Sequence, residues 1–81
     1  MNSEDRKGLR MKLLQELYDY HFTNNGQGKP INKHEVEKEI ELNLAYQYLE
    51  EKNLISIKHF GGSKFDYKIS SYGIDSIESK R

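Results

Sequence analysis

The sequence predicts an α+β fold in a single domain over residues 1–81, with three helices, a two-stranded β-hairpin and a short last helix in that order. Apolar residues in the first half of the chain recur three and four positions apart, which is the spacing on the buried side of a helix. Two later segments alternate apolar and polar residues on either side of Gly61-Gly62-Ser63, which predicts a hairpin. A serine before Ile74 and Ile77 indicates the cap of the last helix.

The first helix is predicted over residues 6–22. Its apolar positions are Leu9, Leu13, Leu14, Leu17, Tyr18 and His21, and its solvent side is expected to carry Arg10, Lys12, Glu16 and Asp19. Ser3 is the expected N-cap, because its hydroxyl can accept a backbone N–H and the acids Glu4 and Asp5 follow in the first turn. Residues 23–30 are rich in turn-forming residues and predict the longest loop.

A short second helix is predicted after this loop. Ile31 can form a short third strand, and Asn32 is the expected N-cap of the helix, with Glu35 in the position of a capping box. The helix carries Val36 and Ile40 four residues apart. It is expected to be short, because a new helix can begin at residues 41–43.

The third helix is predicted from Leu42 or Asn43 to Lys52. Its helical wheel places Leu42, Ala45, Tyr46, Leu49 and Asn53 toward the core. It places Asn43, Leu44, Gln47, Glu50 and Glu51 on the outer side, with Tyr48 on the flank.

The hairpin strands are predicted over residues 54–60 and 64–69. Because successive side chains of a strand point to opposite faces, one face is expected to turn inward with Ile55, Ile57, Phe65, Tyr67 and Ile69. Ser70 or Ser71 can then cap the last helix.

Three segments between about Ile31 and Glu78 resemble the winged helix-turn-helix superfamily. Residues 48–55, Y-L-E-E-K-N-L-I, resemble the Y-L-E-E-K-G-L-I that closes the family's recognition helix and enters its wing. Residues 69–73 are similar to its I-T-x-x-G motif, and residues 74–78 resemble the G-I-D-x-I-E helix of small bacterial and archaeal members. Two features depart from the family: Asn53 replaces a C-cap glycine, and the second helix is short enough that the helix pair is expected to be distorted or to run on as one bent helix.

The resemblance implies a DNA-binding module of the transcription-regulator type, whose partner is double-stranded DNA. The third helix would enter the major groove, where Asn43 and Gln47 can bond adenine edges, and the wing would clamp the backbone. The candidate DNA-binding residues are Lys33, Asn43, Gln47, Tyr48, Lys58, His59 and Lys64. The structural alternatives are that Asn43 is only a helix N-cap, that Gln47 is a solvated surface residue, and that the hairpin lysines only protect a sheet edge.

The charge pattern supports DNA binding only in part. Thirteen basic and thirteen acidic residues cancel, so any DNA contact must use a local patch. Residues 36–53 are acidic, with five glutamates against Lys38 and Lys52, whereas the hairpin carries Lys58, His59, Lys64 and Lys68 against Asp66.

The alternative function is a winged-helix protein-interaction module that does not bind DNA. Nine aromatic residues exceed what so small a core can hide, which predicts a weak homodimer or another protein partner near Leu44 and Tyr48, or near Met11.

Other classes of function find no support in the sequence. There is no cysteine and the three histidines are scattered, so we expect neither a disulfide nor a metal site nor a cofactor. No nucleophile, base and orienting group can be assembled, so we expect no enzyme. No segment approaches the ~20 apolar residues of a membrane span, and the polar start lacks a secretory signal, so we expect a cytoplasmic protein without membrane contact.

Overall fold

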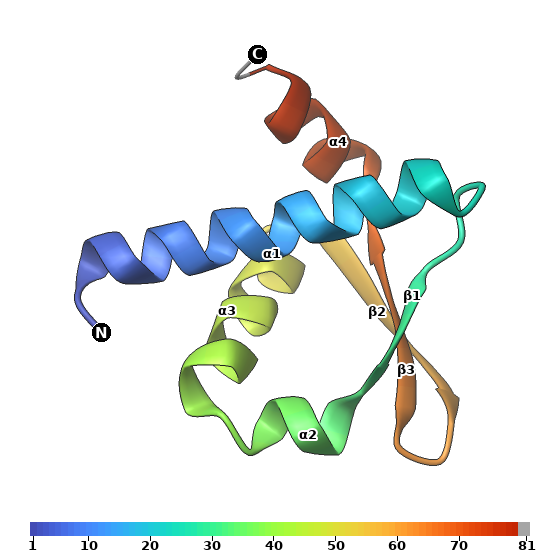
Figure 1. Ribbon diagram of the computed structural model, residues 1–81, viewed down its shortest axis with the longest axis horizontal. Coiled ribbons are helices and arrows are strands. Elements are labelled where there is room, and N and C mark those ends of the chain that lie inside the picture. The colour runs from blue at the N-terminus through green and yellow to red at the C-terminus, as the bar shows by residue number, and fades with distance from the viewer. Residues whose placement is uncertain (80–81) are drawn as a thin grey trace.

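The computed structural model describes residues 1–79, without the side chain of Phe60. Over this range the chain forms four helices and a three-stranded antiparallel sheet of strand order β1-β3-β2 (Figure 1). The elements are α1 (Ser3–Thr23), β1 (Lys29–Asn32), α2 (Lys33–Glu37), α3 (Ile40–Glu51), β2 (Ile55–Gly61), β3 (Lys64–Ile69) and α4 (Ser71–Glu78). The predicted α+β class, the order of elements and the short strand at Ile31 are therefore confirmed.

The sheet is centred on β3, which pairs with both other strands. Ile55 lies opposite Ile69 and Ile57 lies opposite Tyr67, so the apolar side chains share one face as predicted. Lys58 lies opposite Asp66, and the register shifts between His59 and Gly61. On the other edge, β1 pairs with residues 64–67 of β3.

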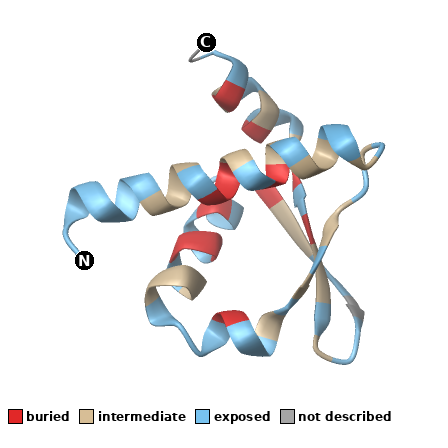
Figure 2. Cartoon of the chain, in the orientation of Figure 1, coloured by how far each residue is buried: buried red, intermediate tan, exposed pale blue. Residues whose placement is uncertain are grey.

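The core lies between the apolar face of the sheet and helices α1 and α3, which cross over it (Figure 2). Its least exposed large side chains are Leu14 of α1, Leu49 of α3 and Tyr67 of β3. The Tyr46 ring meets the Tyr67 ring edge-on, with 4.7 Å between centroids. Within residues 1–79, no helix covers the opposite face of the sheet, which we call the open face (Figure 1).

The N-terminus of α1 differs from the prediction. The N-cap is Asn2 rather than Ser3, because Asn2 has the extended backbone of a cap and its Oδ1 accepts the Asp5 N–H at 2.8 Å. Ser3 is already helical, so α1 begins three residues before the predicted start at residue 6.

Helices α2 and α3 are separate. Asn32 caps α2 as predicted, since its Oδ1 accepts the N–H groups of His34 at 3.0 Å and Glu35 at 3.4 Å. Ile40 does not continue α2 but begins α3. The proposed N-cap role of Asn43 is wrong, because Glu39 holds the cap position and the Asn43 N–H bonds to the Glu39 carbonyl inside the first turn.

The end of α3 is a Schellman motif. The Leu54 N–H bonds to the Leu49 carbonyl and the Asn53 N–H bonds to the Glu50 carbonyl, both at 2.9 Å. Asn53 has a φ of 60° and takes the left-handed conformation that its place in the motif requires. It is exposed, so its predicted place in the core is wrong, because the helix ends one residue earlier, at the C-cap Lys52.

Ser70 ties α4 to this junction. Its hydroxyl donates to the Asn53 carbonyl and accepts the Gly73 N–H as the N-cap of α4. Its own N–H donates to the Leu54 carbonyl at 2.9 Å. The predicted cap of the last helix is therefore Ser70 rather than Ser71, and it also joins two segments that are distant in sequence.

Candidate nucleic-acid interface

Helix α3 carries two different rows of side chains on its outer side. Successive helical residues are about 100° apart, so residues three or four positions apart share a side. One row, the polar flank, consists of Asn43, Gln47 and Glu50, of which Gln47 and Glu50 are exposed and Asn43 is half-buried. The other row, the apolar flank, consists of the exposed residues Ile40, Leu44 and Tyr48.

Glu37 of α2 and Glu50 of the polar flank both act on the phenol of Tyr67 in β3. Burial raises the pKa of Tyr67, and the carboxylates of Glu37 and Glu50 raise it further. Two carboxylates influence one phenol in this way only when both lie near it. Glu37 of α2 and Glu50 of α3 therefore both add negative charge near Tyr67.

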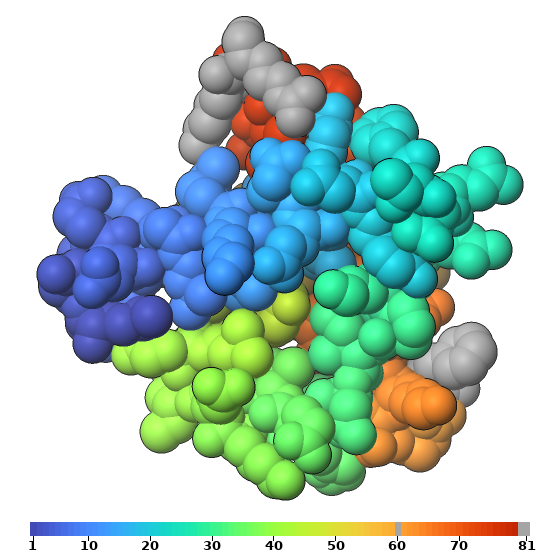
Figure 3. Space-filling view, viewed as in Figure 1, coloured from blue at the N-terminus to red at the C-terminus, as the bar shows by residue number. Residues whose placement is uncertain are grey.

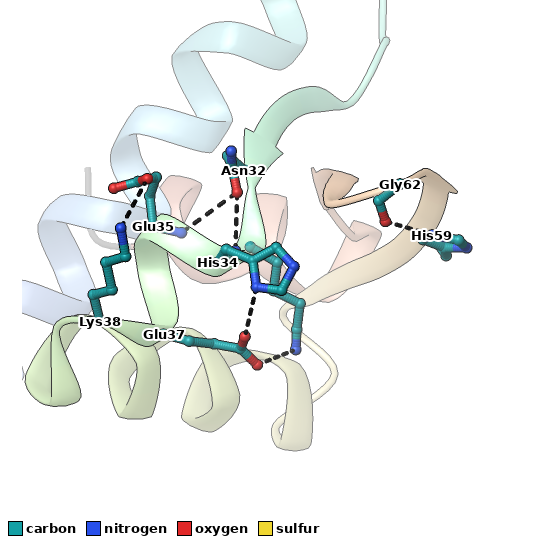
Figure 4. A network of polar contacts seen from close by, with 8 residues as sticks. Asn32, His34, Glu35, Glu37, Lys38, His59 and Gly62 are labelled. Atoms are coloured by element: carbon teal, nitrogen blue, oxygen red, sulfur yellow. Dashed lines mark hydrogen bonds and ion pairs between the residues drawn. The ribbon is translucent and has the colours of Figure 1, made fainter.

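The hairpin turn and the start of α2 are joined directly. The Lys33 N–H donates to the Ser63 carbonyl at 2.9 Å, and Asn32 pairs with Lys64 across the sheet. The Lys33 ammonium lies 5.4 Å from the centre of the Phe65 ring, which also contacts the His59 ring at 4.8 Å. We call Lys33, His34, His59 and Lys64 the α2–hairpin cluster. Figure 4 shows His34 on α2 and His59 on the hairpin.

His59 is held in place by the turn that it helps to close. Its Nε2 lies 2.9 Å from the Gly62 carbonyl oxygen, a distance at which the ring N–H donates a hydrogen bond (Figure 4). Gly62 has a φ of 58°, a conformation that glycine adopts without steric cost. The histidine therefore stays beside Phe65, on the helix-covered side of the hairpin.

The cations of α2 and those of the hairpin differ in whether they have acidic partners. Lys33 Nζ lies 3.7 Å from Glu37 Oε2, and His34 Nδ1 lies 3.9 Å from Glu37 Oε1. Within residues 1–79, Lys58 and Lys64 form no ion pair. The pairs of α2 are solvent-exposed and weak, so a phosphate can compete for Lys33, whereas Lys58 and Lys64 are held by no ion pair among the described residues.

Alternation along the strands separates the hairpin cations. Lys58 and Lys68 extend from the open face with Asp66, whereas His59 lies on the other face with Phe65. The open face is hollowed by a groove of 620 Å³ beneath the loop after α1. Its lining residues are Tyr20, Gly26, Gln27, Gly28, Pro30, Ser56, Lys58, Asp66 and Lys68. Lys64, the first residue of β3, lies at the tip beside Asn32.

Tyr48 contacts helix α1. The Arg10 guanidinium lies over the Tyr48 ring, 4.0 Å from its centre, and the Lys52 ammonium lies 5.8 Å from it. Tyr48 and Gln47 line a groove of 460 Å³ between α1 and α3. The structure therefore places Tyr48 away from the α2–hairpin cluster and puts Gln47 at the border between the two flanks.

Sequence analysis did not identify the roles of Arg6 and Arg10. Arg10 was expected on the solvent side, but it precedes the buried Leu13 and Leu14 by three and four positions and lies on their side of α1. Arg6 forms two hydrogen bonds of 2.9 Å with the Glu41 carboxylate. Spacing within α1 could have indicated the position of Arg10, whereas nothing local links Arg6 to a residue 35 positions away.

The chain was also compared with known proteins, and no family model, curated protein or solved structure matches it. Among the described residues, no three histidine, aspartate or glutamate side chains are grouped closely enough to hold a metal ion. No helix in residues 1–79 has both the length and the apolar character needed to cross a membrane.

Proposed function

We propose that the chain is a winged-helix DNA-binding module of the transcription-regulator type. The proposal takes α2 and α3 as the helix-turn-helix pair, β2 and β3 as the wing, and the polar flank of α3 as the surface that enters the major groove. The observation that carries it is the bond between the Lys33 N–H and the Ser63 carbonyl, because it joins the wing turn to α2 and brings the cations of both to one end of the molecule.

The division of cations between the two faces of the hairpin suits a wing that lies in a minor groove. Such a groove has a phosphate backbone on each side, so a hairpin within it meets phosphate on both of its faces. Lys58 and Lys64 can serve one backbone while His59 and Lys33 serve the other. These contacts fix the position of the protein, whereas Asn43 and Gln47 supply contacts to base edges.

The glutamates of the reading surface limit this binding. Glu37 and Glu50 repel phosphate, so general affinity for DNA is expected to be low and sensitive to salt. A carboxylate facing base edges can accept a hydrogen bond from the amino group of cytosine, which gives Glu50 a role in discrimination. Glu51 lines the groove beside α1 instead, so the two neighbouring acids should behave differently.

The proposal is tested by fluorescence anisotropy of a labelled mixed-sequence duplex at several salt concentrations. Lys64→Ala and Lys33→Ala should each weaken binding and make the slope of log affinity against log salt shallower by about one unit. Lys12→Ala removes the same charge from an exposed part of α1 and should leave the slope unchanged. Equal effects of all three substitutions, or no salt-sensitive binding, would overturn the proposal.

A second candidate is a winged-helix protein-interaction module that does not bind DNA. The acidic residues Glu37 and Glu50 and the exposed apolar flank of α3 favour it. Substitution of Glu50 and, separately, of Glu51 distinguishes the two candidates. Glu50→Gln should tighten non-specific DNA binding if the polar flank lies against DNA, while Glu51→Gln should have little effect. If neither variant nor the wild-type protein binds duplex DNA at low salt, the interaction module is the better explanation.

A further inference from the structure

The apolar flank of α3 is exposed although the core does not use it. Ile40, Leu44 and Tyr48 retain 71%, 51% and 39% of their surface in contact with solvent. They are spaced four residues apart and so form one continuous row along the helix. Single exposed apolar residues are ordinary, but a contiguous row marks a surface that another molecule covers.

This row borders the groove between α3 and the N-terminal half of α1. Leu44 and Tyr48 line the groove together with Leu9 and Ala45, so its lining is partly apolar. The paired side chains of Arg6 and Glu41 join the two helices, and Arg10 lies over Tyr48. Figure 3 shows α1 against α3, with the first turns of α1 extending beyond the rest of the molecule.

The ionic side chains of the groove indicate what covers it. Arg6 and Arg10 balance Glu41 and Glu51, so the lining carries no net charge and does not attract a polyanion. Arg6 and Glu41 satisfy each other, whereas Arg10 and Glu51 form no ion pair within the described residues. Each copy of the surface therefore offers one cation, which lies over Tyr48, and one anion that have no ion-pair partner among the described residues.

We propose that a second copy of this chain covers the apolar flank. In a two-fold dimer the same patch faces itself, so Arg10 of each copy can meet Glu51 of the other and the pair forms twice. The two rows of Ile40, Leu44 and Tyr48 would interdigitate, as residues four apart do when helices pack. A chain of 81 residues has a small core, and such an interface adds buried apolar surface. This inference does not rest on DNA binding.

The dimer is tested by sedimentation velocity of the full chain at concentrations up to about 1 mM, which detects association with a free energy of only about −4 kcal/mol. The wild-type protein should dimerise, and Leu44→Glu should weaken dimerisation at least tenfold. Tyr72→Glu is the control, because Tyr72 is also a large exposed side chain, with 68% of its surface in contact with solvent against 51% for Leu44, but lies on α4. A monomer throughout this range, or a dimer weakened by Tyr72→Glu and not by Leu44→Glu, would overturn the proposal.

A charge exchange tests the pairing independently of apolar contact. Arg10→Glu and Glu51→Arg should each weaken the dimer, because each places like charges opposite one another. The double variant should restore dimerisation to within a few-fold of the wild-type value. Circular dichroism of each variant establishes that it is folded. If the double variant is as weak as the two single variants combined, Arg10 and Glu51 do not meet and the proposed arrangement is wrong.

Discussion

Replacing Gly73 with alanine is expected to destabilise the protein, although alanine is normally the better helix residue. Gly73 is buried in α4, and a Cβ at this position would lie far inside van der Waals contact of the Leu54 carbonyl oxygen and 2.6 Å from Ile69 Cγ1. The Leu54 carbonyl is a backbone group that already accepts the Ser70 N–H, so it cannot move away without loss of that bond. The spacing of Ile69 and Gly73 therefore has a steric reason in this chain.

The magnitude follows from three terms. Overpacking of a tight site costs about 1–3 kcal/mol, and loss of the Ser70 hydrogen bond costs about 1 kcal/mol more. The higher helix propensity of alanine returns up to about 1 kcal/mol. The net loss is about 1–3 kcal/mol, a large part of the roughly 4–12 kcal/mol expected for a domain of this size.

Urea unfolding followed by circular dichroism measures this loss directly, and Gly8 supplies the matched control. Gly8 also lies within a helix, but a Cβ there would meet no atom within 4 Å. Gly8→Ala should therefore stabilise the protein by about 0.5–1 kcal/mol, through helix propensity alone. The same chemical change should thus have opposite signs at the two positions. A Gly73→Ala variant as stable as the wild-type protein would refute the steric argument.

Three further predictions concern single contacts. Asn53→Ala should cost about 1 kcal/mol in urea unfolding and Asn53→Gly should not, because only alanine opposes the left-handed φ of 60°. Burial raises the pKa of Tyr46 from 10.0 to about 12, so the unfolded state loses the phenol proton at a lower pH than the folded state. The free energy of unfolding should therefore fall as the pH rises from 10 toward 12. Tyr46→Phe should reduce that fall in alkaline unfolding curves. Hydrogen bonds from Arg6 lower the pKa of Glu41 in the folded protein. The stabilisation that they give is present above the glutamate pKa of the unfolded state and is lost as the pH falls through the pKa of the folded state. Curves of the free energy of unfolding against pH for the wild-type protein and Arg6→Ala should therefore converge in acid. A constant difference between those two curves at all pH values would contradict the assignment.

The elements that were predicted correctly depend on short-range chemistry. The cap at Asn32 and the alternation of the hairpin each arise from a few neighbouring residues, so the sequence contains the information that specifies them. The errors occurred where two local solutions compete. Asn2 and Ser3 are both good N-caps, and the helix begins at the earlier one because residues 3–5 can all be helical.

The candidate site was predicted less completely, because its arrangement depends on how distant elements pack. Strand alternation could have separated Lys58 from His59, but the contact between Lys33 and the hairpin turn requires the three-dimensional fold. The contact of Arg10 with Tyr48 also requires it, since α1 and α3 are separated by a strand and another helix. A helical wheel of α3 shows which residues leave the core, but it does not show which neighbour each of them meets.

The two proposed interfaces can coexist on α3 because they use different flanks of its outer side. The buried row of Ala45, Tyr46 and Leu49 faces the core, which leaves the apolar flank beside α1 and the polar flank on the remaining part of the outer side. A second copy on the apolar flank would leave Asn43 and Glu50 of the polar flank free to meet DNA. Gln47 belongs to the polar flank but also lines the groove beside the apolar flank, so it is the residue for which both partners would compete. If dimerisation shields Gln47, base reading depends on Asn43 and Glu50, and the preferred sequence of the dimer differs from that of a monomeric variant.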